Sequence, residues 1–184
     1  MQLLECVNTC LSAMGEARVT STAVRHPTVD LINSTITMKK RQYLERGWWF
    51  NVMDTTMYPA TDGSMEYPVN ALSIIGYCGE TFVARDGKLF DMDEGTSIFT
   101  EPKKMRVFYD VAFEDLPECV ANVVMYRTMR EVYVGDLGSD PAVQNMQLNE
   151  QVNNATVETQ HLRNKRFSTR QRSGWSRLQS ALRN

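Results

Sequence analysis

The chain has 184 residues, of which 42% are apolar and 23% charged, and its formal net charge is -2. This length and composition predict one main globular domain with room for a small inserted subdomain, and they exclude a disordered chain. A membrane-spanning helix is excluded too, because no run of about 18 apolar residues occurs, and we expect no signal peptide because the first residues lack a basic start.

The charge is distributed unevenly along the chain. Residues 1–160 hold 13 basic and 22 acidic residues, a net charge of -9, whereas residues 161–184 hold seven basic residues and no acid. An acidic body with a basic tail predicts a tail that docks on something negative.

Two helices are predicted in the first 47 residues. Apolar residues at helical spacing predict the first helix from residue 3 to residue 14, and Gly15 is placed to end it. The second helix begins at Pro27, an early helical position that suits proline, and Gly47 closes it. Its inward face is marked by Val29, Ile32, Ile36 and Tyr43.

The middle third of the chain is predicted to be β-rich. Aromatic and β-branched residues predict a first strand at residues 48–60, and Asp62-Gly63-Ser64 forms a turn after it. Asp86-Gly87 is the strongest hairpin signal in the chain. Further strands are predicted at residues 71–77, 81–85, 88–92 and 105–111.

Helices return after Asp115. Pro117 suits a first helical turn, and apolar residues on more than one face up to Tyr133 predict burial on several sides. We expect both Gly135 and Gly138 to break this helix.

A last helix is predicted to begin at Asp140-Pro141, with Asp140 as its cap. One narrow semi-apolar stripe recurs at intervals of four and three residues: Leu148, Val152, Ala155, Thr159 and Leu162. The rest of the helix is mostly Gln, Asn and Glu, so we expect it to lie on the surface or against a partner.

The basic tail from residue 165 onward is predicted to become ordered only on a partner, because so few residues do not hold an isolated helix. Docking on a protein, contact with nucleic acid and a solvated tail all remain open; its apolar anchors favour docking on a protein. The residues proposed for docking are Arg163, Lys165, Arg166, Phe167, Arg170, Arg172, Trp175, Arg177 and Leu178.

The sequence offers no catalytic constellation. Its two histidines, His26 and His161, are isolated, and no nucleophile elbow, phosphate loop, dinucleotide fingerprint or zinc-protease motif occurs. The acidic turn at residues 91–95 does not fit a calcium loop, because glycine stands fifth instead of sixth and the twelfth position is proline. We therefore predict no enzyme, no cofactor and no metal site. The cysteines are predicted to be small core residues in reduced form: Cys6, Cys10, Cys78 and Cys119.

The aromatic pair Trp48-Trp49 allows two interpretations. A tryptophan can stack on a base or a sugar. Adjacent strand residues point to opposite faces, so only one of the two could join such a site. We favour the structural interpretation, in which one tryptophan lies in the core and the other covers a helix or a neighbouring subunit.

Three segments together resemble one known family. The first is the opening helix that ends at Gly15-Glu16, and the second is Gly47-Trp48-Trp49-Phe50-Asn51 after a helix. The third is the segment from Phe113 to Cys119, in which Leu116-Pro117 opens a helix. Their order and spacing resemble tail tubular protein A of short-tailed phages over residues 1 to about 150. Gly47, Trp48, Trp49, Phe50, Leu116 and Pro117 are expected to shape the fold.

The resemblance implies a mainly α-helical adaptor with a small β subdomain. It does not extend to the basic tail after His161, whose role is inferred from its residues alone. Together these predict an α+β fold: a mainly α-helical adaptor bundle with a small inserted antiparallel β subdomain and an extended C-terminal tail. We expect residues 1–47 and 113–164 to form the helical domain, residues 48–112 the β subdomain, and residues 165–184 the docking tail.

The resemblance also implies a function in the virion tail, with assembly in the cytoplasm of the bacterial host. Family members form a dodecameric ring that joins the portal protein to the tail nozzle protein, and genomic DNA passes through the channel. No membrane partner is implied. We expect the loops at Asp62-Gly63 and Asp86-Gly87 to face the nozzle and the basic tail to dock on the portal. The alternative is a small nucleic-acid-binding protein that grips phosphates with its basic tail; a virion hydrolase is disfavoured because catalytic groups are missing.

Overall fold

A computed structural model describes residues 1–77 and 79–165 of the chain. Within these residues helices and small antiparallel sheets combine in one α+β fold, which confirms the predicted class. The helices are α1 (Leu3–Ala13), α2 (Pro27–Leu44), α3 (Glu118–Leu137) and α4 (Pro141–Asn164), with a 3-10 turn at Phe113–Asp115. The strands are β1 (Val52–Met57), β2 (Ala71–Gly76), β3 (Phe82–Arg85), β4 (Lys88–Asp91) and β5 (Lys103–Tyr109).

The ends of α1 and α2 confirm the sequence prediction. After α1, Gly15 takes a φ of +77° and the N–H of Glu16 returns to the carbonyl of Leu11 at 2.9 Å, which closes the helix with a left-handed residue. Pro27 is the first residue of α2, where its missing N–H costs nothing. The predicted inward face of α2 is buried.

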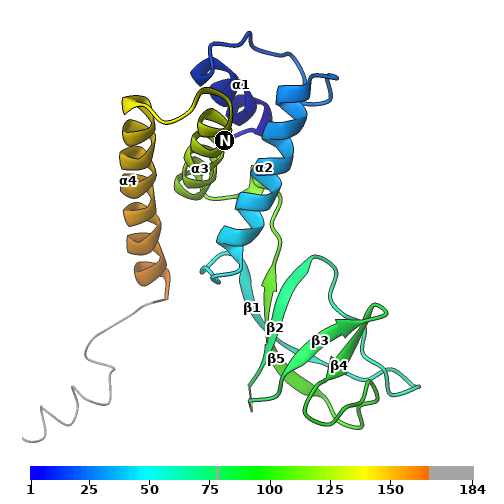
Figure 1. The fold of residues 1–184 in the computed structure, drawn as a ribbon. Helices are drawn as coiled ribbons and strands as arrows, with labels where there is room; N and C mark the ends of the chain where they lie inside the picture. The colour runs from blue at the N-terminus through cyan, green and yellow to red at the C-terminus, as the bar shows by residue number, and fades with distance from the viewer. Residues whose placement is uncertain (78, 166–184) are drawn as a thin grey trace, which may run out of the picture.

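The helical part of the molecule is built around α3, which packs against α1, α2 and α4 (Figure 1). Nine residues of α3 are buried, more than on any other described helix, so the predicted burial on several sides is confirmed. Leu116 and Pro117 bring the chain into this layer: Leu116 is buried, and Pro117 immediately precedes α3. The larger of the two cores in the described residues therefore lies where α1, α2 and α4 meet α3.

One predicted break in α3 is wrong. The helix runs through Gly135 and ends only at Gly138, whose φ is +82°. A glycine inside a helix costs about 1 kcal/mol relative to alanine, a penalty that neighbouring contacts can offset. Val132, one turn earlier, is buried in the core and holds that part of α3 in place.

The predicted cap of α4 is confirmed, because the Asp140 carboxylate accepts a hydrogen bond from the N–H of Ala142 at 2.8 Å. An amphipathic helix is expected to turn its apolar stripe toward the core of its own chain, and α4 does not do so. Its semi-apolar stripe points to solvent, and its inward face is mostly polar, with Met146 and Val157 as its buried residues. Val157 lies five residues after Val152, about 140° away around the helix at roughly 100° per residue.

The β-rich part lies beyond one end of the helical layer (Figure 1). Strands β1, β5 and β2 form one antiparallel sheet in that order, and β3 and β4 form a hairpin. Its turn residues, Asp86 and Gly87, have φ values of +50° and +74°, as a type I′ turn requires. A second, smaller core fills this part: Met65, Ile74, Phe82, Leu89, Phe99, Met105 and Val107.

The first strand is shorter than predicted. β1 begins at Val52, and residues 48–51 form a turn that connects α2 to the strand. The argument that Trp48 and Trp49 alternate across a strand is therefore wrong, because both lie in this turn. The division of the chain into a helical domain, a β subdomain and a docking tail stays a prediction.

Candidate assembly surfaces

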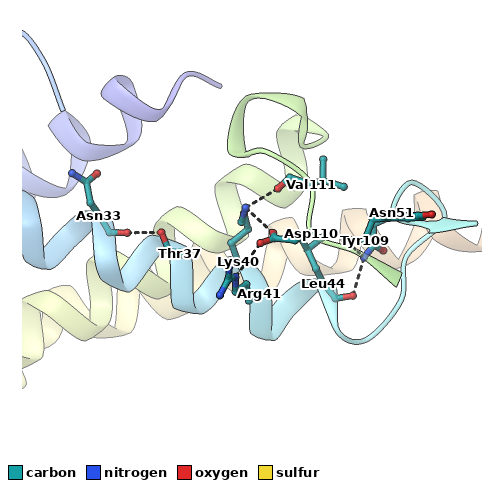
Figure 2. A network of polar contacts seen from close by, with 9 residues as sticks. All are labelled: Asn33, Thr37, Lys40, Arg41, Leu44, Asn51, Tyr109, Asp110 and Val111. Atoms are coloured by element: carbon teal, nitrogen blue, oxygen red, sulfur yellow. Dashed lines mark hydrogen bonds and ion pairs between the residues drawn. The ribbon is translucent and has the colours of Figure 1, made fainter. Parts of the chain in front are cut away.

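The joint between the helical layer and the β part is held by the buried side chain of Asn51, which is 2% exposed (Figure 2). Its Oδ1 accepts a hydrogen bond from the N–H of Trp48 at 2.7 Å. Its Nδ2 donates to the carbonyl of Leu44 at 3.0 Å and to the carbonyl of Tyr109 at 3.1 Å. One amide therefore connects the end of α2, the turn after it and the end of β5.

An ion-paired cluster reinforces the same joint (Figure 2). Lys40 Nζ lies 2.7 Å from Asp110 Oδ1 and donates to the carbonyl of Val111 at 2.7 Å. Arg41 Nε donates to the other carboxylate oxygen of Asp110 at 3.0 Å. The Asp110 side chain is only 15% exposed, so these charges meet in a partly dehydrated site, where an ion pair is screened less than at an open surface. The joint fixes how the two parts of the molecule are held together.

Gly47 makes this joint sterically possible. It has a φ of +78°, and a side chain there would overlap the ring of Phe108 on β5. Only glycine satisfies both the left-handed backbone and the close approach of the strand. The predicted helix-ending role of Gly47 is confirmed, and the contact with Phe108 adds a packing reason that the sequence did not reveal.

Aromatic residues pack around the C-terminal end of α4. Trp48 is buried, donates its Nε1–H to the carbonyl of Tyr43 at 2.8 Å and stacks on that ring. The His161 ring on α4 meets Trp48 edge-on at 5.2 Å between centroids, and it lies 6.1 Å from Trp49. Trp49 is half-buried and also meets Phe50 edge-on. The pair Trp48-Trp49 is thus a core residue and a cover for α4, and Trp48 is not open to a ligand.

Burial among these aromatic rings lowers the pKa of His161, and the positive charge of Lys165 contributes to the shift. His161 Nδ1 is buried and has no hydrogen-bond partner among the described residues. A proton on that nitrogen would place a charged N–H in an unpaired position. The surroundings of the His161 ring, near the C-terminal end of α4, therefore favour the neutral form of this histidine.

The proposed docking residues fall mostly outside the described residues. Arg163 and Lys165 are exposed at the C-terminal end of α4. Arg166, Phe167, Arg170, Arg172, Trp175, Arg177 and Leu178 lie outside the described residues. The structure therefore describes only the start of the basic tail. This start, called the root of the tail, is the exposed C-terminal end of α4, near the contact between Trp49 and His161.

The two predicted loops lie next to each other. The Asp62 carboxylate accepts hydrogen bonds from the Ser64 N–H at 2.9 Å and hydroxyl at 2.7 Å, and the bond from the hydroxyl is the main reason why its pKa is lowered to about 2. Its other oxygen lies 3.5 Å from Lys88 Nζ, in the residue after the Asp86-Gly87 turn. The N–H of Tyr67 donates to the carbonyl of Gly87 at 2.8 Å. Asp62, Asp86 and Gly87 are exposed, and Gly63 is half-buried.

These loops and the root of the tail lie on opposite sides of the β part (Figure 1). The open face of the β1–β5–β2 sheet carries Arg106, whose guanidinium donates to Asp54 at 2.7 and 3.1 Å and to the Tyr77 hydroxyl at 3.1 Å. The bond from Arg106 is the main reason why the pKa of Asp54 is lowered to about 2. The carboxylate is thus held in its charged, acceptor form.

The described residues offer little chemistry. No group of three His, Cys, Asp or Glu side chains within residues 1–77 and 79–165 is placed to hold a metal ion. Cys6, Cys10 and Cys119 are buried and free, and a hydrogen bond to Cys10 together with burial raises the pKa of the Cys6 thiol. No helix of the described part is long and apolar enough to cross a bilayer.

Comparison with known proteins identifies the family of the chain. A family model described as tail tubular protein matches residues 4–167. The chain belongs to the tail tubular protein family. Tail tubular protein A of Klebsiella phage KP34 is 35% identical over 170 residues, which cover 92% of this chain and 91% of that protein. The chain is therefore a structural protein of a bacteriophage tail and a component of the virion.

Sequence reasoning placed Asn51 in a segment that shapes the fold of this tail tubular protein, but it gave neither the hydrogen bonds of Asn51 nor the ion pair of Lys40 with Asp110. Asn51 stood in the Gly-Trp-Trp-Phe-Asn segment, and an asparagine shortly after a helix-ending glycine is a signal for a side chain that bonds to the backbone. Asp110 and Lys40 gave no such signal, because their pairing joins positions 70 residues apart.

Proposed function

We propose that this tail tubular protein is a head-to-tail adaptor, a ring subunit that joins the portal to the tail nozzle. The observation that carries the proposal is the placement of two exposed regions on opposite sides of one braced body: the root of the basic tail at Lys165, and the paired loops at Asp62 and Asp86 (Figure 1). A subunit that bridges two partners needs two separate contact regions, and the Asn51 and Asp110 joint keeps them at a fixed spacing.

In this proposal the tail, residues 165–184, binds the portal, and the paired loops face the nozzle. Twelve copies form the ring, as the family resemblance implies, and the phage genome passes through its channel. Residues 1–160 carry a net charge of -9, which would repel DNA phosphates and let the genome slide without adhering. Assembly takes place in the cytoplasm of the bacterial host.

Deleting residues 165–184 tests the portal contact. The deletion removes six basic residues and no acid, and it leaves the described core intact, because that core draws on residues no later than Val157. The truncated subunit should keep its circular dichroism spectrum and unfolding midpoint while it loses binding to purified portal. Portal binding at full-length affinity by the truncated chain would contradict the docking proposal.

A nucleic-acid-binding function is the second candidate, since the tail is basic. If all six basic residues of the tail contacted phosphates, log K for DNA would fall with log salt at a slope of about -5. A tail docked on protein by Trp175 and Leu178 should depend much less on salt. Substituting alanine for Trp175 distinguishes the two functions further, because it should weaken portal binding and leave a purely phosphate-based DNA affinity almost unchanged.

A further inference from the structure

The outer face of α4 is an unpartnered apolar stripe. Leu148 is 58% exposed, Val152 67% and Leu162 50%, and these residues recur on one side of the helix over four turns. Ala155 and Thr159 lie between them and are exposed as well. Isolated apolar residues are common on protein surfaces, whereas an aligned row of them marks a surface that another molecule covers.

The face of α4 that packs on its own subunit carries several polar contacts. Glu150 accepts from Arg127 Nε at 2.7 Å and pairs with Arg130 at 3.2 Å. Asn154 accepts from the Tyr43 hydroxyl at 2.8 Å. The inward face thus buries Met146 and Val157 among polar contacts, while the apolar row faces solvent, where an isolated surface helix would place polar residues. The row is therefore suited to burial in an assembly.

A second apolar surface lies between α2 and α3. A groove of about 260 Å³ is lined by Leu31, Thr35, Glu131, Val132, Gly135 and Asp136. Leu31 is 52% exposed, and Leu137 at the end of α3 is 54% exposed. Gly135 has no side chain and nothing within 4 Å of where a Cβ would stand, so this stretch of α3 leaves room for side chains from outside. This surface is called the α2–α3 groove below.

The charges of the two surfaces are complementary. Glu150 pairs inward with Arg127, Glu158 pairs with Arg46 at the surface, and the residues of the stripe themselves carry no charge. Arg163 and Lys165 stand exposed at its C-terminal end. In the α2–α3 groove Glu131 is paired with Lys39, and Asp136 stands exposed at the rim. The stripe, which is uncharged and ends at the basic residues Arg163 and Lys165, is thus complementary to the α2–α3 groove, which carries the acidic Asp136 at its edge.

The net charge of the subunit restricts where two copies can meet. Two bodies that each carry -9 over residues 1–160 repel each other. Contact between them is least costly where at least one of the two surfaces is free of net negative charge, and the stripe, with Arg163 and Lys165 at its end, meets that condition.

We propose that the stripe of α4 packs into the α2–α3 groove of a second copy of this chain. Because the stripe and the groove are different surfaces, each copy uses one surface for the neighbour on one side and the other surface for the neighbour on the other. Such a contact generates a ring when its rotation closes. The inference deepens the proposed function and rests on it for the ring, since it names the surfaces through which neighbouring subunits meet.

Directed cross-linking tests the contact. Chains with Cys78→Ser carry either Leu31→Cys or Val152→Cys; Cys6, Cys10 and Cys119 are buried. The two variants are mixed at high concentration and treated with a bismaleimide that has a short flexible spacer. A covalent dimer should form in the mixture and not in either variant alone, because a link needs one cysteine from each surface.

Asn149→Cys is the matched control for Val152→Cys, since Asn149 is exposed on α4 about 60° off the stripe when measured from Val152 at roughly 100° per residue. Mixed with the Leu31→Cys chain, it should give several-fold less dimer. Absence of dimer in the Val152 mixture, or equal yields in both mixtures, would overturn the proposal.

Sedimentation of charge variants supplies an independent readout. Val152→Asp should lower the self-association of the concentrated chain, and Asn149→Asp, which adds the same charge off the stripe, should leave it near the wild-type level. Equal sedimentation of the two variants would count against the stripe. Neither experiment contains portal, so a chain that cross-links as expected but does not bind portal would refute the adaptor function and leave the self-contact standing.

Discussion

Replacing Asn51 with alanine should destabilise the molecule more than its small size suggests. The side chain is buried and makes three hydrogen bonds, to Trp48, Leu44 and Tyr109. At roughly 1 kcal/mol for each bond, the free energy of unfolding should fall by about 3 kcal/mol. The loss should not be smaller, because the N–H of Trp48 loses its Asn51 acceptor in a buried place, although the Leu44 carbonyl keeps the N–H of Gly47 at 3.0 Å.

Urea unfolding followed by circular dichroism measures this change, with the midpoint and the slope fitted separately. Asn149→Ala is the matched control: it removes an exposed asparagine from α4 and should change the free energy of unfolding by less than about 0.5 kcal/mol. If Asn51→Ala lost less than about 1 kcal/mol, the idea that this amide fastens the two parts of the molecule would be refuted.

Two further predictions concern Gly47 and His161. Gly47→Ala should lose at least about 2 kcal/mol, because a left-handed alanine costs roughly 1–2 kcal/mol and its Cβ also overlaps Phe108. Gly15 has a similar φ of +77° but open space around it, so Gly15→Ala should lose only the cost of the left-handed backbone, roughly 1–2 kcal/mol. Equal losses of unfolding free energy for the two variants in urea would rule out the overlap with Phe108 as a cause. The pKa of His161 is lowered by folding, so the unfolded chain binds the proton more readily, and stability should be full above about pH 6.5 and fall as the pH drops below it. His161→Gln should unfold with a flatter pH profile between pH 7.5 and 5, and a profile as steep as that of the wild type would show that another group is responsible.

The local elements were predictable because their signals are short-range. Gly15 ends α1, Pro27 begins α2, Asp140 caps α4, and Asp86-Gly87 forms the hairpin turn, each through the conformational preference of the residues themselves. The helix through Gly135 was missed because tertiary contacts outweighed a weak local preference.

The orientation of α4 was not predictable from its pattern. Periodicity identified a stripe through Leu148 and Val152, and a stripe is normally expected to face the core of its own chain. Glu150 and Asn154 face inward instead, because Arg127 and Tyr43 supply charged and hydrogen-bonding partners from distant parts of the chain. Such pairings depend on the folded arrangement, so a pattern along one helix cannot reveal them.

The candidate sites show the same limit. The exposed positions of Asp62 and Asp86 followed from turn chemistry, but their closeness through Lys88 needed the fold. The docking residues after Lys165 lie outside the described residues, so their role stays a prediction.

Addition of purified portal to the purified chain, followed by negative-stain electron microscopy, tests the central claim most directly. The account predicts a ring of subunits stacked coaxially on the portal, formed by the full-length chain and absent with the chain that lacks residues 165–184. Absence of ring density on every portal tested, with the full-length chain folded and in excess, would contradict the adaptor function.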